Sequence, residues 1–363
     1  MPKSTSSARS CGSIGICALL LALIAGCVPQ PAYHHSVPQT LYARKFERLW
    51  QNYDRYYPYF DYKHIHWNAE YARYRPQVSR VRNDTQFLAL LKHMLAPLKD
   101  VHAVLVTPSG RWIHTYEPPR FDRPNWNLAS LRKNVTDLTW YGRKWGTGTV
   151  HGIPYIVIAA WTHAGFSVAN FDYILNQYRR SPALIFDVRM NGGGDDRLAY
   201  AVAGRFTTQK RLTEYLQFRN GPLHSDLTPP KPRYLKPRGP WQFSKPVALL
   251  IGPDCFSSNE SFIAAMQTLP NVTTIGATTG GGSGDPRFFD LGAGWRYSVP
   301  TWIDYTADKR VIEWNGIPPE VPVKTTPQDF RHGADPVLDA AVRLLEAKLH
   351  APRERKAQAE PVP

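Results

Sequence analysis

The sequence predicts an α/β fold in which short buried strands alternate with amphipathic helices. Apolar runs at 183–188 and 247–251 are each followed by turn residues and then by a helical pattern of apolar side chains. The 363 residues are 43% hydrophobic and 20% charged, which favours a globular protein over a disordered chain or a membrane bundle. Because sites in open α/β folds lie at the carboxyl ends of the strands, the turns after these two runs are the first places to search.

The first 26 residues are predicted to be a lipoprotein signal peptide. A short basic leader precedes the apolar stretch 14–24, which is too short for a stable membrane span, and small residues precede Cys27. This pattern resembles bacterial lipoprotein signals, in which Cys27 is lipidated and becomes the first residue; an ordinary cleaved signal peptide is the alternative. By the sorting pattern of such proteins, Val28 favours an outer-membrane lipoprotein facing the periplasm in a Gram-negative cell, and otherwise a lipid-anchored protein of the cell surface.

Two further segments are predicted to lie outside the folded region. Residues 27–39 have the composition of a tether, and residues 351–363 that of a flexible tail. The net charge of +15 could indicate a nucleic-acid partner, but the sequence has no nucleic-acid motif and its positive residues are dispersed. We therefore expect contact with the membrane through the lipid anchor and none with nucleic acid; the sequence predicts no oligomeric state.

Residues 40–100 are predicted to form a helical subdomain. Apolar residues at positions 46, 49, 50 and 53 have helical spacing, and Pro58 is expected to end that helix. A second helix is expected after Trp67, and Asp84 can cap a third.

Residues 101–350 are predicted to form the α/β core. Its expected strands are 102–106, 183–188, 247–251 and 272–275, with a hairpin over 150–160 and helices that begin at or near Ser167, Asp195, Ser257 and Asp335. Residues 110–148 show no clear period. A core of this kind predicts a largely parallel sheet.

Ser257 follows one of the buried strands and opens a helix. At a helix N-terminus, backbone N–H groups and the helix dipole favour developing negative charge, as a serine nucleophile requires. The alternative is purely structural, because Ser257 with Glu260 three residues later also matches a capping box.

The turn after the other buried strand contains Gly192, Gly193 and Gly194. Glycines allow the backbone to approach a substrate and to direct N–H groups at one point, which is how an oxyanion hole is built. A plain strand-to-helix turn is the alternative.

His102 and Glu313 are the candidate base and its orienting carboxylate. An imidazole can accept a serine proton near neutral pH, although an arbitrary histidine is more often a surface or core residue. Glu313 lies between apolar residues on an expected strand, where it could orient a base or simply face solvent.

Four segments in this order resemble the tail-specific (C-terminal processing) protease family and its tricorn-core branch. The matching segments are Leu-Lys-Asp-Val-His at 98–102, Asp-Val-Arg-Met-Asn-Gly-Gly-Gly at 187–194, Ser-Ser-Asn-Glu at 257–260, and Glu-Trp-Asn-Gly at 313–316 with Pro-Glu-Val-Pro-Val at 319–323. The resemblance spans roughly residues 41–325 and implies a crotonase-like core with an N-terminal helical subdomain. No PDZ module fits in 110–148, so substrate selection is expected to depend on the helical subdomain and on loops such as 207–245.

The resemblance implies that Ser257 is the nucleophile, that the amides of 192–194 bind the oxyanion, and that His102 is the base with Glu313 behind it. A Ser–Lys dyad is not expected, because no lysine occurs from 246 to 308. Val101 departs from the tricorn pattern, in which a serine before the histidine bridges to the glutamate.

The predicted function is that of a serine peptidase that hydrolyses peptide bonds of exported proteins or peptides. Its partner would be a polypeptide, and neither a cofactor nor a metal is expected. A mobile loop is expected at 280–284, on the substrate side. The alternative function is a catalytically inactive, peptide-binding lipoprotein on the same fold, with Val101 marking decay of the proton relay.

Overall fold

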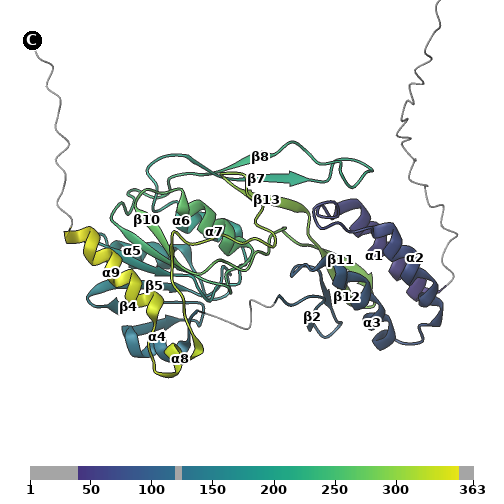
Figure 1. Ribbon diagram of the computed structural model, residues 1–363, viewed down its shortest axis with the longest axis horizontal. Coiled ribbons are helices and arrows are strands. Elements are labelled where there is room, and N and C mark those ends of the chain that lie inside the picture. Colours follow the sequence, from purple (N-terminus) through teal and green to yellow (C-terminus); the bar gives the residue numbers. More distant parts are fainter. Residues whose placement is uncertain (1–39, 119–124, 351–363) are drawn as a thin grey trace, which may run out of the picture. The chain divides into compact units, whose positions relative to one another are not determined.

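The computed structural model describes residues 40–118 and 125–350 (Figure 1). The predicted signal peptide, the tether with Cys27 and the tail 351–363 lie outside the described residues. Within those two ranges, no helix is both long and apolar enough to cross a lipid bilayer. The predicted α/β class with an N-terminal helical region is confirmed.

Helices occur at the start of the described chain and between the strands of the core. They are α1 (Leu41–Tyr56), α2 (Trp67–Tyr74), α3 (Asp84–Leu95), α4 (Leu128–Asn134), α5 (Val168–Gln177), α6 (Asp196–Ala203), α7 (Ser258–Gln267), α8 (Pro327–Arg331) and α9 (Pro336–His350), with 3₁₀ turns η1 (Arg75–Arg80) and η2 (Ala96–Leu98).

The largest sheet has seven strands in the order β14-β10-β9-β6-β5-β4-β3. These are β14 (Val321–Pro322), β10 (Val272–Gly276), β9 (Val247–Ile251), β6 (Leu184–Asp187), β5 (Ile153–Ile158), β4 (Trp145–Val150) and β3 (Thr136–Tyr141). Pairing is parallel from β14 to β5 and antiparallel from β5 to β3. The carboxyl ends of β6 and β9 are therefore neighbours, as expected for a parallel sheet.

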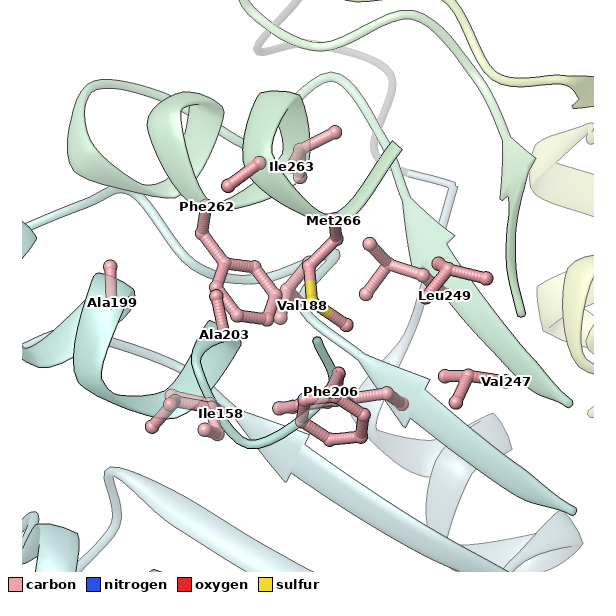
Figure 2. Close-up of a cluster of buried hydrophobic side chains, with 14 of the residues drawn as sticks. Ile158, Val188, Ala199, Ala203, Phe206, Val247, Leu249, Phe262, Ile263 and Met266 are labelled. Atoms are coloured by element: carbon pink, nitrogen blue, oxygen red, sulfur yellow. The ribbon is translucent and has the colours of Figure 1, made fainter. Parts of the chain in front are cut away.

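Alternate residues of this sheet belong to two different hydrophobic clusters. In β9, Leu249 packs into a cluster with α5, α6 and α7, whereas Ala248 and Leu250 pack into a cluster with α4 and α9. Helices therefore cover both faces, as the uninterrupted apolar runs require. Figure 2 shows part of the first cluster, where Phe262 and Met266 of α7 meet side chains of the sheet and of α6.

A second sheet packs against the N-terminal helices. Its order is β11-β12-β1-β2, formed by β11 (Arg287–Gly292), β12 (Trp295–Val299), β1 (Val104–Val106) and β2 (Trp112–His114). Phe46 and Tyr53 of α1 share one buried cluster with Leu105 of β1 and Tyr297 of β12. The N-terminal helices thus build a common core with strands from two distant parts of the chain.

A third sheet corrects the expectation of loops at 207–245. That segment contains β7 (Arg211–Phe218) and β8 (Lys231–Leu235). β7 is the central strand and pairs with both β8 and β13 (Trp302–Thr306). The prolines at 229, 230 and 232 concealed the second strand, because Pro is depleted in strands, but β8 is an edge strand and can include one.

Smaller differences concern helix caps and strand ends. The α3 cap is Asn83 rather than Asp84, because the Asn83 side chain accepts from the amide of Gln86. The expected hairpin begins earlier, as β4 and β5, with its turn at residues 151–152. The 110–148 segment contributes β2, α4 and β3.

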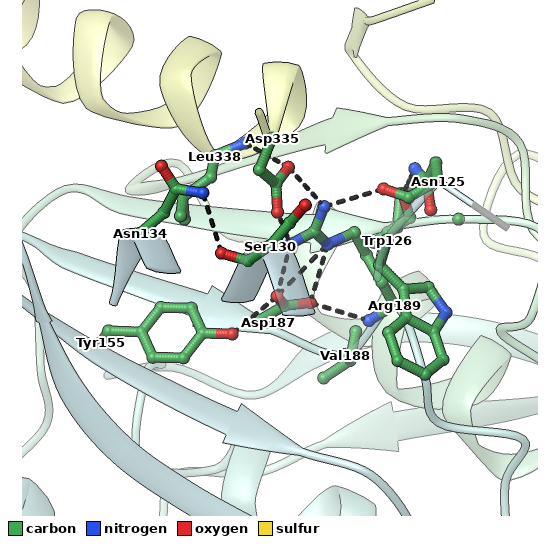
Figure 3. Close-up of polar contacts among 12 residues, drawn as sticks. Asn125, Trp126, Ser130, Asn134, Tyr155, Asp187, Val188, Arg189, Asp335 and Leu338 are labelled. Carbon is green, nitrogen blue, oxygen red and sulfur yellow. Dashed lines mark hydrogen bonds and ion pairs between the residues drawn. The ribbon is translucent and has the colours of Figure 1, made fainter. Parts of the chain in front are cut away.

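A buried ion cluster fixes the end of β6 (Figure 3). The Arg189 guanidinium contacts Asp187 and Asp335, each at 2.8 Å, and donates to the carbonyl of Asn125 at 2.8 Å. Tyr155 donates to Asp187 at 2.8 Å. The first residues of the 187–194 turn are therefore fixed by contacts with Asp335, the residue that precedes α9.

Candidate active site

Ser257 stands between β9 and α7 in a backbone conformation that is rare for a residue other than glycine. Its φ is 55° and its ψ is −133°. Its side chain caps no amide of α7, so the capping-box alternative is not the structure's arrangement. Strained residues of this kind concentrate at functional sites, where the surrounding packing enforces them.

Asn259 and Cys255 tie the serine segment to the turn after β6. The side-chain amide of Asn259 donates to the carbonyls of Val188 (3.1 Å) and Asn191 (3.0 Å), and the Cys255 thiol donates to the carbonyl of Val188 (3.2 Å). Sequence reasoning missed the role of Asn259. Its place inside the Ser-Ser-Asn-Glu segment was the available signal.

The glycine turn touches the serine directly. A side chain added at Gly193 would put its Cβ 2.7 Å from the Cβ of Ser257, closer than real contacts allow, so only glycine fits. The Gly193 amide donates to the Asn191 side chain at 2.9 Å and is already occupied. In the described residues, the amides of Gly192, Gly194 and Ser258 have no acceptor.

His102 is half-buried before β1 and is held through its backbone. Its amide donates to the Asp100 side chain at 2.9 Å, and its carbonyl accepts from the Ser298 hydroxyl at 2.5 Å. Burial lowers the pKa of the imidazole, an effect that Asp100 opposes and Lys63 reinforces. This shift favours the neutral imidazole, the state that a general base needs.

The His102 ring makes no hydrogen bond to Ser257 within the described part of the chain, and its Nδ1 is buried without a partner. Both residues line one cavity, and catalytic hydrogen bonds are often long in an empty site.

Glu313 does not line that cavity and lies in a turn instead of the expected strand. Its carboxylate accepts from the Ser283 amide at 3.0 Å and pairs with Lys63 at 2.5 Å. Burial and the neighbouring Asp100 raise its pKa to about 8, and Lys63 opposes that rise. Glu313 therefore makes no direct hydrogen bond to the imidazole within the described chain. It is linked to His102 through Lys63, whose other partner Asp100 accepts from the His102 backbone amide.

Lys63 is a second residue that the sequence analysis did not single out. Its buried ammonium also pairs with Asp100 at 2.9 Å, and Tyr57 donates to the same carboxylate oxygen at 2.9 Å. Asp100 was visible in the Leu-Lys-Asp-Val-His segment, but the lysine lies 37 positions earlier in a stretch with no recognisable motif.

The expectation of a mobile loop at 280–284 is wrong. Glu260 accepts from the amides of Gly281 (2.9 Å) and Gly282 (2.8 Å), and the Ser257 amide donates to the Gly282 carbonyl at 2.8 Å. The loop is buried, and any side chain at Gly280 or Gly282 would collide with the ring of Phe256. The glycines serve close packing, so a glycine-rich sequence here does not indicate flexibility.

The cavity has a volume of about 600 Å³ and contains the serine, the histidine and the glycine turn together. Its lining includes Ser257, His102, Gly192, Gly194, Asp285, Asp304, Trp112 and Phe288. A serine hydroxyl, an imidazole and backbone N–H groups without acceptors, together in one cavity, are the groups that acyl transfer requires.

Two family profiles match the chain. Peptidase family S41 matches residues 152–323, and the tricorn protease C1 domain matches residues 38–96. A solved structure described as a "putative peptidase" from Parabacteroides merdae is 32% identical, with a TM-score of 0.74 and coverage of 84% of this chain and 97% of that one. The chain belongs to peptidase family S41.

More distant solved structures share the fold. Mature CPAF is 12% identical with a TM-score of 0.63, covering 85% of this chain and 97% of that one. A lipoprotein from Streptococcus agalactiae is 15% identical with a TM-score of 0.56, covering 82% and 96%. No curated protein matches the chain. The predicted relationship to tail-specific and tricorn-like proteases is confirmed.

Proposed function

We propose that this S41 family member is a serine peptidase in which Ser257 is the nucleophile and His102 the general base. The observation that supports it most is the strained Ser257, which makes no cap and shares a cavity with His102 and the glycine turn. Glu313 supports the base indirectly, through Ser283 and Lys63.

In the proposed reaction, Ser257 Oγ attacks the peptide carbonyl carbon while His102 takes the hydroxyl proton. The carbonyl oxygen becomes an oxyanion, which the unoccupied amides of Gly192, Gly194 and Ser258 can bind. His102 then gives the proton to the leaving amine, and water releases the acyl group by the same steps in reverse. The substrates would be exported proteins or peptides.

Labelling with a fluorophosphonate probe tests this proposal. The wild type should be labelled at Ser257, and both Ser257→Ala and His102→Ala should lose labelling. Ser79→Ala is the matched control, because that hydroxyl is exposed on η1 and only contacts the carbonyl of Pro76. A folded wild type that is neither labelled nor active on peptides would instead support a binding role.

We also propose that the protein is anchored to lipid through Cys27, on the outer membrane facing the periplasm. The support is the sequence pattern around Cys27, which lies outside the described residues. Cells fed an alkyne fatty acid should label the wild-type protein and not Cys27→Ser. Equal labelling of both would contradict the proposal.

A further inference from the structure

We propose that the cavity selects peptides with a lysine or arginine side chain beside the scissile bond. This inference names the substrate class of the proposed peptidase, and it rests on that proposed function. It comes from the charges and aromatic rings that line the cavity around Ser257.

The cavity carries negative charge although the protein as a whole carries +15. Two of its carboxylates are already neutralised, since Asp195 pairs with Arg197 at 2.7 Å and Asp196 with Arg233 at 2.5 Å. Within residues 40–118 and 125–350, the Asp285 carboxylate makes no ion pair or hydrogen bond of its own, although the charges of Asp196 and Arg233 act on it from a distance. It is therefore available to a positive group that enters the cavity.

Asp304 supplies the second, independent observation. It lines the cavity and is only 2% exposed; its Oδ2 accepts from Ser283 at 3.1 Å, and its Oδ1 has no donor in the described structure. Glu214 on the neighbouring strand β7 also has one buried oxygen without a donor. Buried carboxylate oxygens without a donor are costly, and an incoming ammonium or guanidinium group would supply one.

Burial, reinforced by Glu214, raises the pKa of Asp304 well above its usual range. A cation that enters the cavity beside Asp304 would stabilise its ionised carboxylate, whereas a neutral or acidic side chain would not.

Aromatic rings form another part of the lining. Trp112 is 55% exposed and Phe288 is 38% exposed, and their ring centroids are 5.5 Å apart in an edge contact. Rings that line a cavity can hold both the aliphatic stem and the charged end of a lysine or arginine, as Phe288 already does for Arg296, whose guanidinium carbon lies 5.8 Å from the ring centroid.

The first test measures binding, and it does not depend on catalysis. Peptides that differ only in lysine, norleucine or glutamate at one position are titrated against Ser257→Ala by fluorescence anisotropy. We expect the lysine peptide to bind about tenfold more tightly than the norleucine peptide, from the new charge-assisted contacts, and the glutamate peptide to bind most weakly. Equal affinity for the lysine and norleucine peptides would overturn the inference.

Substitutions in the Ser257→Ala background locate the effect. Asp285→Asn should remove much of the preference for lysine, and Asp285→Lys should favour the glutamate peptide. Asp304→Asn tests the buried carboxyl. Asp285 is exposed, and asparagine suits its left-handed backbone (φ 42°), so a folding defect at 304 leaves the test at 285 intact. Asp137→Asn, an exposed residue with a φ of 54° outside the cavity, is the matched control and should keep the preference.

Hydrolysis by the wild type separates the two proposals. Probe labelling together with a higher kcat/KM for lysine and arginine peptides supports both. Labelling without a preference for lysine and arginine peptides refutes the proposed selectivity and still supports the peptidase. Tight, charge-dependent binding by a protein that the probe never labels retains the selective cavity and refutes catalysis.

Discussion

Two buried ion clusters in this protein share one arrangement of charges and differ in their surroundings. In each, one cation lies between two carboxylates: Arg189 between Asp187 and Asp335, and Lys63 between Asp100 and Glu313. All the side chains are 0–1% exposed. The Arg189 cluster fixes the fold, whereas the Lys63 cluster also contacts the backbone of residues that line the candidate active site.

The Arg189 cluster satisfies its donors among structural partners. The planar guanidinium binds both carboxylates through paired contacts and donates a further hydrogen bond to the backbone carbonyl of Asn125. The Lys63 ammonium is a point charge, and its carboxylate partners also bind the amides of His102 and Ser283. Changes in the charge of the second cluster are therefore transmitted to the candidate base.

The largest expected effect is that of Arg189→Met. Removing the cation leaves two buried carboxylates uncompensated, and the free energy of unfolding should fall by about 3–5 kcal/mol. Urea denaturation measures it. Arg310→Met is the control: its pair with Asp308 is 51% and 61% exposed, and it should change stability by less than about 1 kcal/mol. Equal effects in the two variants would contradict the structural role of the Arg189 cluster.

Lys63→Met should reduce stability less than Arg189→Met does, and it should reduce activity more. Lys63 opposes the burial that raises the pKa of Glu313 to about 8, so loss of the lysine should raise this pKa further and keep the carboxyl protonated at neutral pH. We expect a loss of about 2 kcal/mol in unfolding free energy and a fall in kcat/KM at unchanged KM. Lys63→Arg should restore part of both. A stability loss as large as that of Arg189→Met, without a change in kcat, would remove the distinction between the clusters.

The dependence of stability on pH sharpens the comparison further. Burial raises the pKa of Glu260 to about 7 and that of Glu313 to about 8, above the 4.5 of an exposed glutamate. The folded state therefore binds more protons than the unfolded state between pH 4.5 and 8, and stability is lost as the pH rises through that window.

Thermal melts from pH 5 to 9 measure this effect. The melting temperature should fall toward high pH by several degrees, about what 1–2 kcal/mol produces in a chain of this size. The fall should be smaller in Glu260→Gln, which cannot ionise and retains one oxygen for the loop amides. A melting temperature that rises across this range would show that the carboxyls are ionised in the fold.

The smallest effect is expected for Ser298→Ala. The hydroxyl donates to the His102 carbonyl and accepts from the Val104 amide at 3.1 Å, so it positions the base without touching substrate. Its loss should cost about 1 kcal/mol of stability and lower kcat a few-fold with KM unchanged. Urea denaturation and steady-state kinetics on one substrate check both. If kcat is unaffected while Lys63→Met lowers it, the ion cluster alone positions His102.

Features that depend on residues close together in the sequence could be predicted from it. Buried apolar runs ending in turns predicted the α/β class, and those turns contain Ser257 and the glycines that now lie in one cavity. Lys63 could not be predicted, because its partner Glu313 is 250 positions away and no local pattern links them. The structure of 280–284 was mispredicted for a related reason: whether a glycine gives freedom or close packing depends on what lies against it.

The ring of Phe256 beside Gly280 and Gly282 has a consequence for how this sequence can change over evolutionary time. Neither position can gain a side chain while the ring stays, and a smaller residue at 256 would leave a hole next to the serine. The three sites should therefore vary together or not at all. Gly280→Ala alone should destabilise the fold, because its methyl group would collide with the Phe256 ring. Adding Phe256→Ala removes that ring, so the double variant should lose less stability than Gly280→Ala alone.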